Sequence, residues 1–261
     1  MAVALAATEY GAGPPVAILH GLFGSGRNWR SIAQQLAARH RVVAFDLRNH
    51  GASPWAKGMS YGEMVEDLRV SLRARDIEHA AALGHSMGGK VAMLMALFHP
   101  GEVDRLVVVD IAPAANPPTL LAYVRAMRAV DLHGVTRRIQ VELQLAGAVP
   151  DPDERAFLLQ NLVIDKNDAH WRLNLEEIER GFSQIVGFPD LPADTAYRGP
   201  ALFVAGARSN YVEPEHEPAI RRRFPQARII RITGAGHWVH AEQPQAFLQT
   251  VSTFLAGAEL A

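Results

Sequence analysis

Short apolar runs alternate with longer amphipathic segments over the first part of the chain. The apolar runs have strand length and lie at 16–20, 42–46, 80–84 and 106–110, and segments with helical spacing lie at 28–38, 61–74 and 88–99. Runs that are apolar on both faces and separated by helices are typical of a parallel sheet covered on both sides. Two further runs and a last helix follow at 201–205, 228–232 and 244–255. The pattern predicts an α/β fold with a mostly parallel sheet and helices on both faces.

The alternation stops between residues 111 and 200. Proline-containing turns open and close this stretch, and four segments with helical spacing lie inside it, at 120–129, 135–145, 153–161 and 173–182. A helical stretch between two strands of one sheet favours an insertion over a separate domain. We expect residues 1–111 and 200–261 to form the core and residues 112–199 to form an inserted helical cap.

One serine lies between a predicted buried strand and a predicted helix. Residues 84–88 read Gly-His-Ser-Met-Gly, so the chain must turn sharply at Ser86. A glycine two residues away on each side removes the Cβ atoms that would clash where the strand and the helix cross. Such a turn presents the hydroxyl at the edge of the sheet, beside the positive end of the helix. The pattern favours Ser86 as a catalytic nucleophile.

A serine hydroxyl is a weak nucleophile near neutral pH and needs a base that is itself held in place. His237 follows the last predicted strand on a glycine-rich loop and is the candidate base, with His240 as the neighbouring alternative. Asp110 ends a buried strand, so it would lie at the same sheet edge as Ser86 and is the candidate acid. Hydrolases with such a serine turn carry their nucleophile, acid and base in this chain order.

Two backbone amides are expected to stabilise the oxyanion of acyl transfer. The Met87 amide follows the nucleophile, and the Leu22 amide lies in the glycine-containing turn 20–24 after the first buried strand. The polar loop 46–53 is interpreted as a support for that turn. Aromatic side chains are expected to wall an apolar substrate pocket under the cap, namely Phe23, Phe182, Phe188, Tyr211 and Trp238.

Composition narrows the function further. The 261 residues are 49% hydrophobic and 20% charged with a net charge of −1, which gives no field that would attract nucleic acid or an anionic membrane. The chain has no cysteine, which excludes disulfides and a thiol nucleophile. No apolar run approaches membrane-spanning length and no basic leader precedes the first strand. We therefore expect a cytoplasmic protein that acts on a small molecule without a metal or an organic cofactor.

Taken together, these motifs resemble the α/β-hydrolase superfamily over nearly the whole chain. The resemblance is carried by segments that occur in order at the expected strand ends, at 20–25, 46–53, 84–89 and 236–237. Within the superfamily the chain is most similar to the bacterial YbfF-type acyl esterases and their mitochondrial animal relatives, through residues 108–113, 161–163 and 171–175. The resemblance implies the α/β-hydrolase fold. It also implies a serine carboxylesterase that forms an acyl-enzyme from small-to-medium acyl esters or thioesters.

One position departs from the superfamily pattern. Many members carry the acid in a turn after the penultimate strand, whereas this chain has Ser209 at that place. A serine cannot stabilise an imidazolium as a carboxylate does, so the role passes to Asp110, with Glu213 and Glu215 as alternatives. Two other functions stay open, a lyase that uses the same three residues and a protein that only binds a ligand in the pocket.

Overall fold

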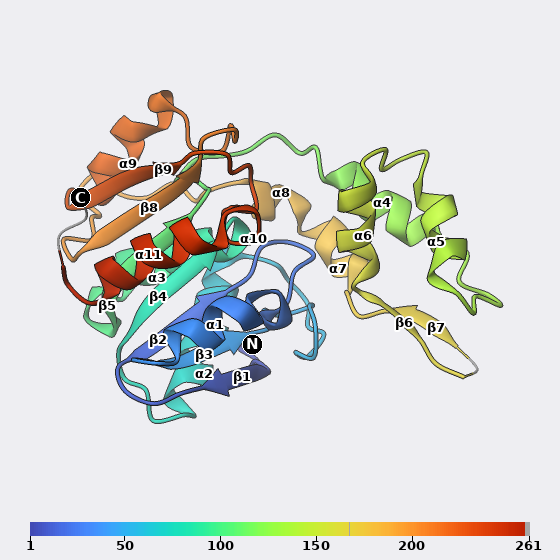
Figure 1. Cartoon of the computed structure of the whole chain (residues 1–261), viewed down its shortest axis with the longest axis horizontal. Coiled ribbons are helices and arrows are strands. Elements are labelled where there is room, and N and C mark those ends of the chain that lie inside the picture. The colour runs from blue at the N-terminus through green and yellow to red at the C-terminus, as the bar shows by residue number, and fades with distance from the viewer. Residues whose placement is uncertain (167, 259–261) are drawn as a thin grey trace.

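A mostly parallel sheet forms the centre of the molecule. The computed structural model describes residues 1–166 and 168–258, and within them the main sheet has seven strands in the order β1-β3-β2-β4-β5-β8-β9 (Figure 1). The strands are β1 (Ala7–Tyr10), β2 (Pro15–Leu19), β3 (Arg41–Phe45), β4 (Ala80–His85), β5 (Val103–Val109), β8 (Ala201–Gly206) and β9 (Ala227–Ile232). β1 runs antiparallel to β3, and the other neighbours are parallel. The predicted fold class is confirmed.

Helices bury both faces of this sheet. On one face, α1 (Arg30–Leu36) and α11 (Pro244–Leu255) share an apolar cluster with the strands. On the other face, a second cluster includes side chains of α2 (Tyr61–Arg73), α3 (Met87–Phe98) and α9 (Glu217–Arg223). Every residue of β4 and β8 is therefore buried. Strands covered on both faces need no alternation of polar and apolar positions, which is why continuous apolar runs predicted them.

The sequence pattern missed the shorter elements. β1 is an edge strand whose residues are partly or fully exposed, so it has no apolar run. α9 and α10 (Val239–Glu242) are too short for a clear helical period. The described residues also include the 3₁₀ turns η1 (Gly26–Trp29), η2 (Pro100–Glu102) and η3 (Pro214–His216). None of the helices in residues 1–166 and 168–258 combines the length and the apolar character needed to cross a membrane.

A helical insertion separates β5 from β8. It contains α4 (Leu121–Ala129), α5 (Arg138–Leu145), α6 (Pro152–Leu159), α7 (Leu175–Arg180), α8 (Phe182–Val186), and a hairpin of β6 (Leu162–Ile164) and β7 (Ala169–Trp171) that the pattern did not predict. Figure 1 shows the insertion to one side of the sheet. Its apolar side chains belong to the same buried cluster as those of α2 and α3. We propose that residues 112–199 act as a cap on the core of residues 1–111 and 200–261.

Candidate active site

β4 turns into α3 at Ser86. Its backbone has φ of +51° and ψ of −118°, a conformation that residues other than glycine rarely adopt. The Ser86 amide donates to the Val109 carbonyl oxygen over 3.0 Å. The flanking glycines are required. A Cβ on Gly84 would lie 2.1 Å from the Gly88 carbonyl oxygen, and a Cβ on Gly88 would lie 2.4 Å from the Leu19 carbonyl oxygen. The packed strands thus hold Ser86 in a strained turn at the carboxyl edge of the sheet.

Asp110 follows β5 at the same edge and is fully buried. It has φ of +50°, and its amide donates to the Val204 carbonyl oxygen over 2.9 Å. The Gly206 amide donates to Oδ1 over 2.8 Å, while the Ser209 hydroxyl and His237 Nδ1–H both donate to Oδ2, the latter over 2.7 Å. Three donors satisfy a buried carboxylate that would otherwise be costly to desolvate. The Asp110 carboxylate is therefore in place to hold the orientation of the His237 ring.

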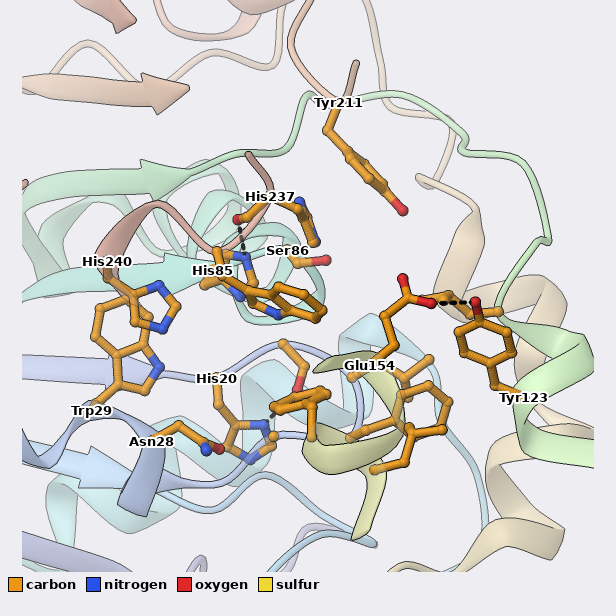
Figure 2. Close-up of a pocket in the computed structure, with 18 of the residues that line it drawn as sticks. His20, Asn28, Trp29, His85, Ser86, Tyr123, Glu154, Tyr211, His237 and His240 are labelled. Atoms are coloured by element: carbon orange, nitrogen blue, oxygen red, sulfur yellow. Dashed lines mark hydrogen bonds between the residues drawn. The ribbon is translucent and has the colours of Figure 1, made fainter. Parts of the chain in front are cut away.

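His237 lies between β9 and α10. Its carbonyl oxygen accepts a hydrogen bond from His85 Nε2–H over 2.9 Å, and the two ring centroids are 4.6 Å apart. Tyr211 stacks on the His237 ring with a centroid distance of 4.1 Å. Because Nδ1–H is donated to Asp110, Nε2 is the ring nitrogen left free for proton transfer. Figure 2 shows His237 and Ser86 in the wall of one cavity.

The turn after β2 lies against the serine. A Cβ on Gly21 would be 3.2 Å from the Cβ of Ser86. The following residue, Leu22, lines the same cavity as Ser86. His20 holds this turn, because its Nδ1–H donates to the Gly21 carbonyl oxygen over 2.7 Å and its Nε2 accepts from the Leu47 amide over 2.9 Å. Burial lowers the pKa of His20 to about 4, so the ring is neutral near pH 7. Leu47 belongs to the polar loop, which therefore supports the turn.

Two backbone amides near Ser86 are available to a ligand, because neither has an acceptor among residues 1–166 and 168–258. Met87 is the first residue of α3, and amides of the first helical turn lack an intrahelical acceptor. The Leu22 amide makes no hydrogen bond within the residues that the structure describes. Both can receive an acceptor oxygen, and the positive end of the α3 dipole favours negative charge there.

Two adjoining pockets, here called the larger and the smaller lobe, open at Ser86. The larger lobe has a volume of about 230 Å³ and the smaller lobe about 40 Å³. The lobes meet at residues that line both, namely Leu22, Ser86, Leu120 and Tyr211. Tyr123 and Glu154 belong to the insertion, whereas Trp29 and His237 belong to the core, and all four face the larger lobe (Figure 2). The insertion thus closes the cavity over the sheet edge.

The structure places four of the five expected pocket residues around this cavity, namely Phe23, Phe182, Tyr211 and Trp238. The expectation for Phe188 is corrected, because it lines a separate depression beside α9. α8 ends at Val186, and the chain leaves Gly187 in an extended conformation toward β8. This path carries Phe188 away from Ser86.

The sequence reasoning missed Lys90, which lines the smaller lobe. Lys90 is 1% exposed, and its Nζ donates to the carbonyl oxygens of Val186 and Gly187, over 2.8 Å each. Burial lowers the pKa of Lys90 to about 7. A signal was present in the sequence, since Lys90 is the one charged residue in the otherwise apolar and glycine-containing α3.

The alternative candidates take other positions. His240 is buried and stacks on Trp29 with a centroid distance of 3.9 Å, and burial lowers its pKa to about 3. Glu213 and Glu215 are exposed where η3 begins. Among residues 1–166 and 168–258, no three His, Asp or Glu side chains are placed to share a metal ion.

A model of the alpha/beta hydrolase fold family matches residues 14–244. The chain belongs to the α/β-hydrolase family. This α/β hydrolase is 42% identical over 252 residues to a Mus musculus protein named sn-1-specific diacylglycerol lipase ABHD11, a match that covers 93% of this chain and 81% of the relative. It is 36% identical over 245 residues to esterase YbfF of Escherichia coli, with 92% of each chain covered.

A solved structure supports the same family assignment. The structure of a marine microorganism esterase matches with a TM-score of 0.93 and 37% identity, covering 97% of this chain and 100% of that one. The resemblance inferred from the motifs is therefore confirmed at the level of the superfamily and of the YbfF-type esterases. This α/β hydrolase is an esterase or lipase, that is, a carboxylic ester hydrolase.

Proposed function

We propose that this α/β hydrolase is a serine carboxylesterase that cleaves small-to-medium acyl esters or thioesters through an acyl-enzyme. One observation carries the proposal: the carboxylate of Asp110 holds His237 by Nδ1 over 2.7 Å, and the His237 ring lines the same cavity as Ser86. The three side chains come from three distant segments of the chain. Together they supply a nucleophile, a base and a group that orients the base.

The reaction begins when His237 Nε2 takes the hydroxyl proton of Ser86 as Oγ attacks the carbonyl carbon. The carbonyl oxygen becomes an oxyanion and accepts hydrogen bonds from the amides of Met87 and Leu22. Asp110 keeps Nδ1–H in place and stabilises the imidazolium. When the tetrahedral intermediate collapses, Nε2–H protonates the leaving alcohol or thiol and the acyl group remains on Ser86.

The second half of the reaction releases the acid. Water enters the position left by the alcohol or thiol, and His237 Nε2 takes a proton from it as its oxygen attacks the acyl carbon. Collapse of the second tetrahedral intermediate breaks the bond to Ser86 Oγ. The proton on Nε2 returns to Oγ, so the enzyme ends in its starting state.

The test compares the wild-type enzyme with Ser86→Ala on p-nitrophenyl acetate and p-nitrophenyl butyrate. Alanine keeps the Cβ and removes the nucleophile, so kcat should fall by at least about 10⁴-fold. Ser252→Ala changes an exposed serine on α11 and serves as the matched control with unchanged turnover. A serine-reactive organophosphonate should label the wild type at Ser86, as read by peptide mass spectrometry.

The other outcomes identify the rival functions. Labelling of Ser86 without turnover of any ester would favour a lyase that uses the same three residues. Ligand binding without either labelling or turnover would favour a protein that only binds. Equal turnover in Ser86→Ala and the wild type would remove Ser86 from the mechanism.

A further inference from the structure

A carboxylate outside the three reacting side chains holds the loop that carries His237. Glu242 is the last residue of α10, and its side chain reaches back to this loop. The Gly236 amide donates to Oε2 of Glu242 over 2.8 Å, and the Trp238 amide donates to Oε1 over 3.2 Å. The carboxylate therefore binds the residue before the base with one oxygen and the residue after the base with the other.

A third hydrogen bond fixes the peptide of His237 itself. His85 Nε2–H donates to the His237 carbonyl oxygen over 2.9 Å (Figure 2). The Glu242 carboxylate and the His85 ring together hold three consecutive residues of the loop. Without these contacts Gly234 and Gly236 would leave the loop flexible, because glycine restricts the backbone less than any other residue.

Glu242 also joins this loop to the turn that holds the acid. Arg208 Nη2 donates to Glu242 Oε2 over 2.9 Å. Arg208 lies in the turn after β8, and in the same turn the Gly206 amide donates to the Asp110 carboxylate over 2.8 Å. The turn and the loop are in direct contact, since a Cβ on Gly206 would lie 2.1 Å from the Gly236 carbonyl oxygen. Contacts between these two segments thus set the position of the base relative to the acid.

We propose that Glu242 is a positioning residue that keeps His237 within reach of Ser86. The inference rests on the proposed function, in which His237 Nε2 takes the proton of Ser86 and later returns it. Such a transfer depends steeply on placement, and a displacement of about 1 Å can cost about 10²-fold in rate. Both oxygens of Glu242 accept amides of the loop, so its effect reaches the substrate through His237.

The test uses Glu242→Gln, which keeps the size of the side chain and replaces one acceptor oxygen with an amide group that cannot accept. One loop amide then loses its acceptor. We expect kcat on p-nitrophenyl butyrate to fall by about 10–10²-fold, with KM within about threefold of the wild-type value. Glu217→Gln is the matched control and should keep the wild-type kcat, because Glu217 lies on α9 and its ion pair with Arg221 does not involve the loop.

A double variant separates positioning from a loss of stability. In His237→Ala the base is absent, so the addition of Glu242→Gln should leave the residual turnover unchanged. A fall in turnover in both backgrounds would show a general structural role and overturn the proposal. Wild-type kcat in Glu242→Gln, with turnover still dependent on Ser86 and His237, would also overturn it and leave the proposed function standing. Wild-type turnover in Ser86→Ala would overturn both.

Hydrogen exchange measured by nuclear magnetic resonance on the wild-type enzyme needs no variant to fold. The amides of Gly236 and Trp238 should exchange more slowly than in an unstructured peptide, because both donate to Glu242. Exchange at the rate of an unstructured peptide would show that the carboxylate does not hold the loop in solution, and the proposal would fail.

Discussion

The backbone conformations at the sheet edge of the core differ from those in the helical insertion. Beside the cavity, three core residues other than glycine have positive φ, namely Phe23, Ser86 and Asp110. In the described part of residues 112–199, Gly134 alone has positive φ. Strained conformations persist where the surrounding packing determines them, and the fully buried strands β4 and β8 provide that packing. The core is therefore the part of the molecule that can hold reacting groups in a fixed geometry.

The insertion is held by its contacts with the core. The helices that the structure describes there have five to nine residues each, which is too short for stability in isolation. Buried polar contacts join it to the core: the Tyr61 hydroxyl donates to the Ile185 carbonyl oxygen over 2.6 Å, and Asn161 Nδ2–H donates to the Phe23 carbonyl oxygen over 2.8 Å. The comparison teaches that the chemistry belongs to the core, whereas the shape of the cavity belongs to both parts.

Substitution of the acid should give the largest effect if the chemistry belongs to the core. Asp110→Asn places a neutral amide against His237, which can neither stabilise the imidazolium nor favour the required tautomer. We expect kcat on p-nitrophenyl butyrate to fall by about 10³–10⁴-fold, with circular dichroism unchanged. Glu213→Gln is the matched control and should retain wild-type kcat. If Glu213→Gln lost activity and Asp110→Asn kept it, the acid would have to be assigned to Glu213.

Lowering the pH should destabilise the core but not the insertion. Burial lowers the pKa of His20 to about 4 and of His50 and His240 to about 3, whereas the insertion's His133 and His170 are exposed. The unfolded chain binds more protons than the folded one between pH 6.5 and these values, so the free energy of unfolding falls as pH falls through that window. Each buried ring should cost about 2 kcal/mol at pH 5.

Denaturant unfolding at pH 7.5 and pH 5 measures this loss. His50→Gln keeps a donor for the Arg48 carbonyl oxygen and removes the titrating ring, so it should reduce the loss between the two pH values by about 2 kcal/mol. His133→Gln, in the insertion, should leave the loss unchanged. Equal losses in the wild type and His50→Gln would show that His50 does not contribute to the pH dependence.

A change in the insertion should alter binding more than chemistry. Phe157 lies on α6, lines the larger lobe, and has its ring centroid 5.4 Å from that of Trp238. Phe157→Ala should raise KM for benzyl acetate by about tenfold through lost apolar contact, with little change in kcat. Leu143→Ala removes an apolar side chain of α5 that is 70% exposed, and it should behave as wild type. A fall in kcat at constant KM would show that the insertion also positions the reacting groups.

Sequence analysis predicted those parts of the fold and of the site that depend on residues close together in the chain. The buried strands carry continuous apolar runs because helices cover both faces. In contrast, β1 is a partly exposed edge strand, and β6 and β7 have only three residues each. The strained turn at Ser86 could be predicted because it needs glycine at two nearby positions. The expectation for Phe188 was wrong because the direction of the chain after α8 is not encoded in the aromatic residue itself.

By itself the sequence determined the alternation of strands and helices, the place of the insertion and the serine turn, because periodicity and steric exclusion act over a few residues. Only the tertiary structure decided that Ser209 and His237 donate to the same carboxylate oxygen of Asp110, that Lys90 reaches the end of α8, and that two lobes meet at Ser86. These contacts join segments far apart in the chain. Their geometry depends on how whole elements pack, which no local pattern of residues records.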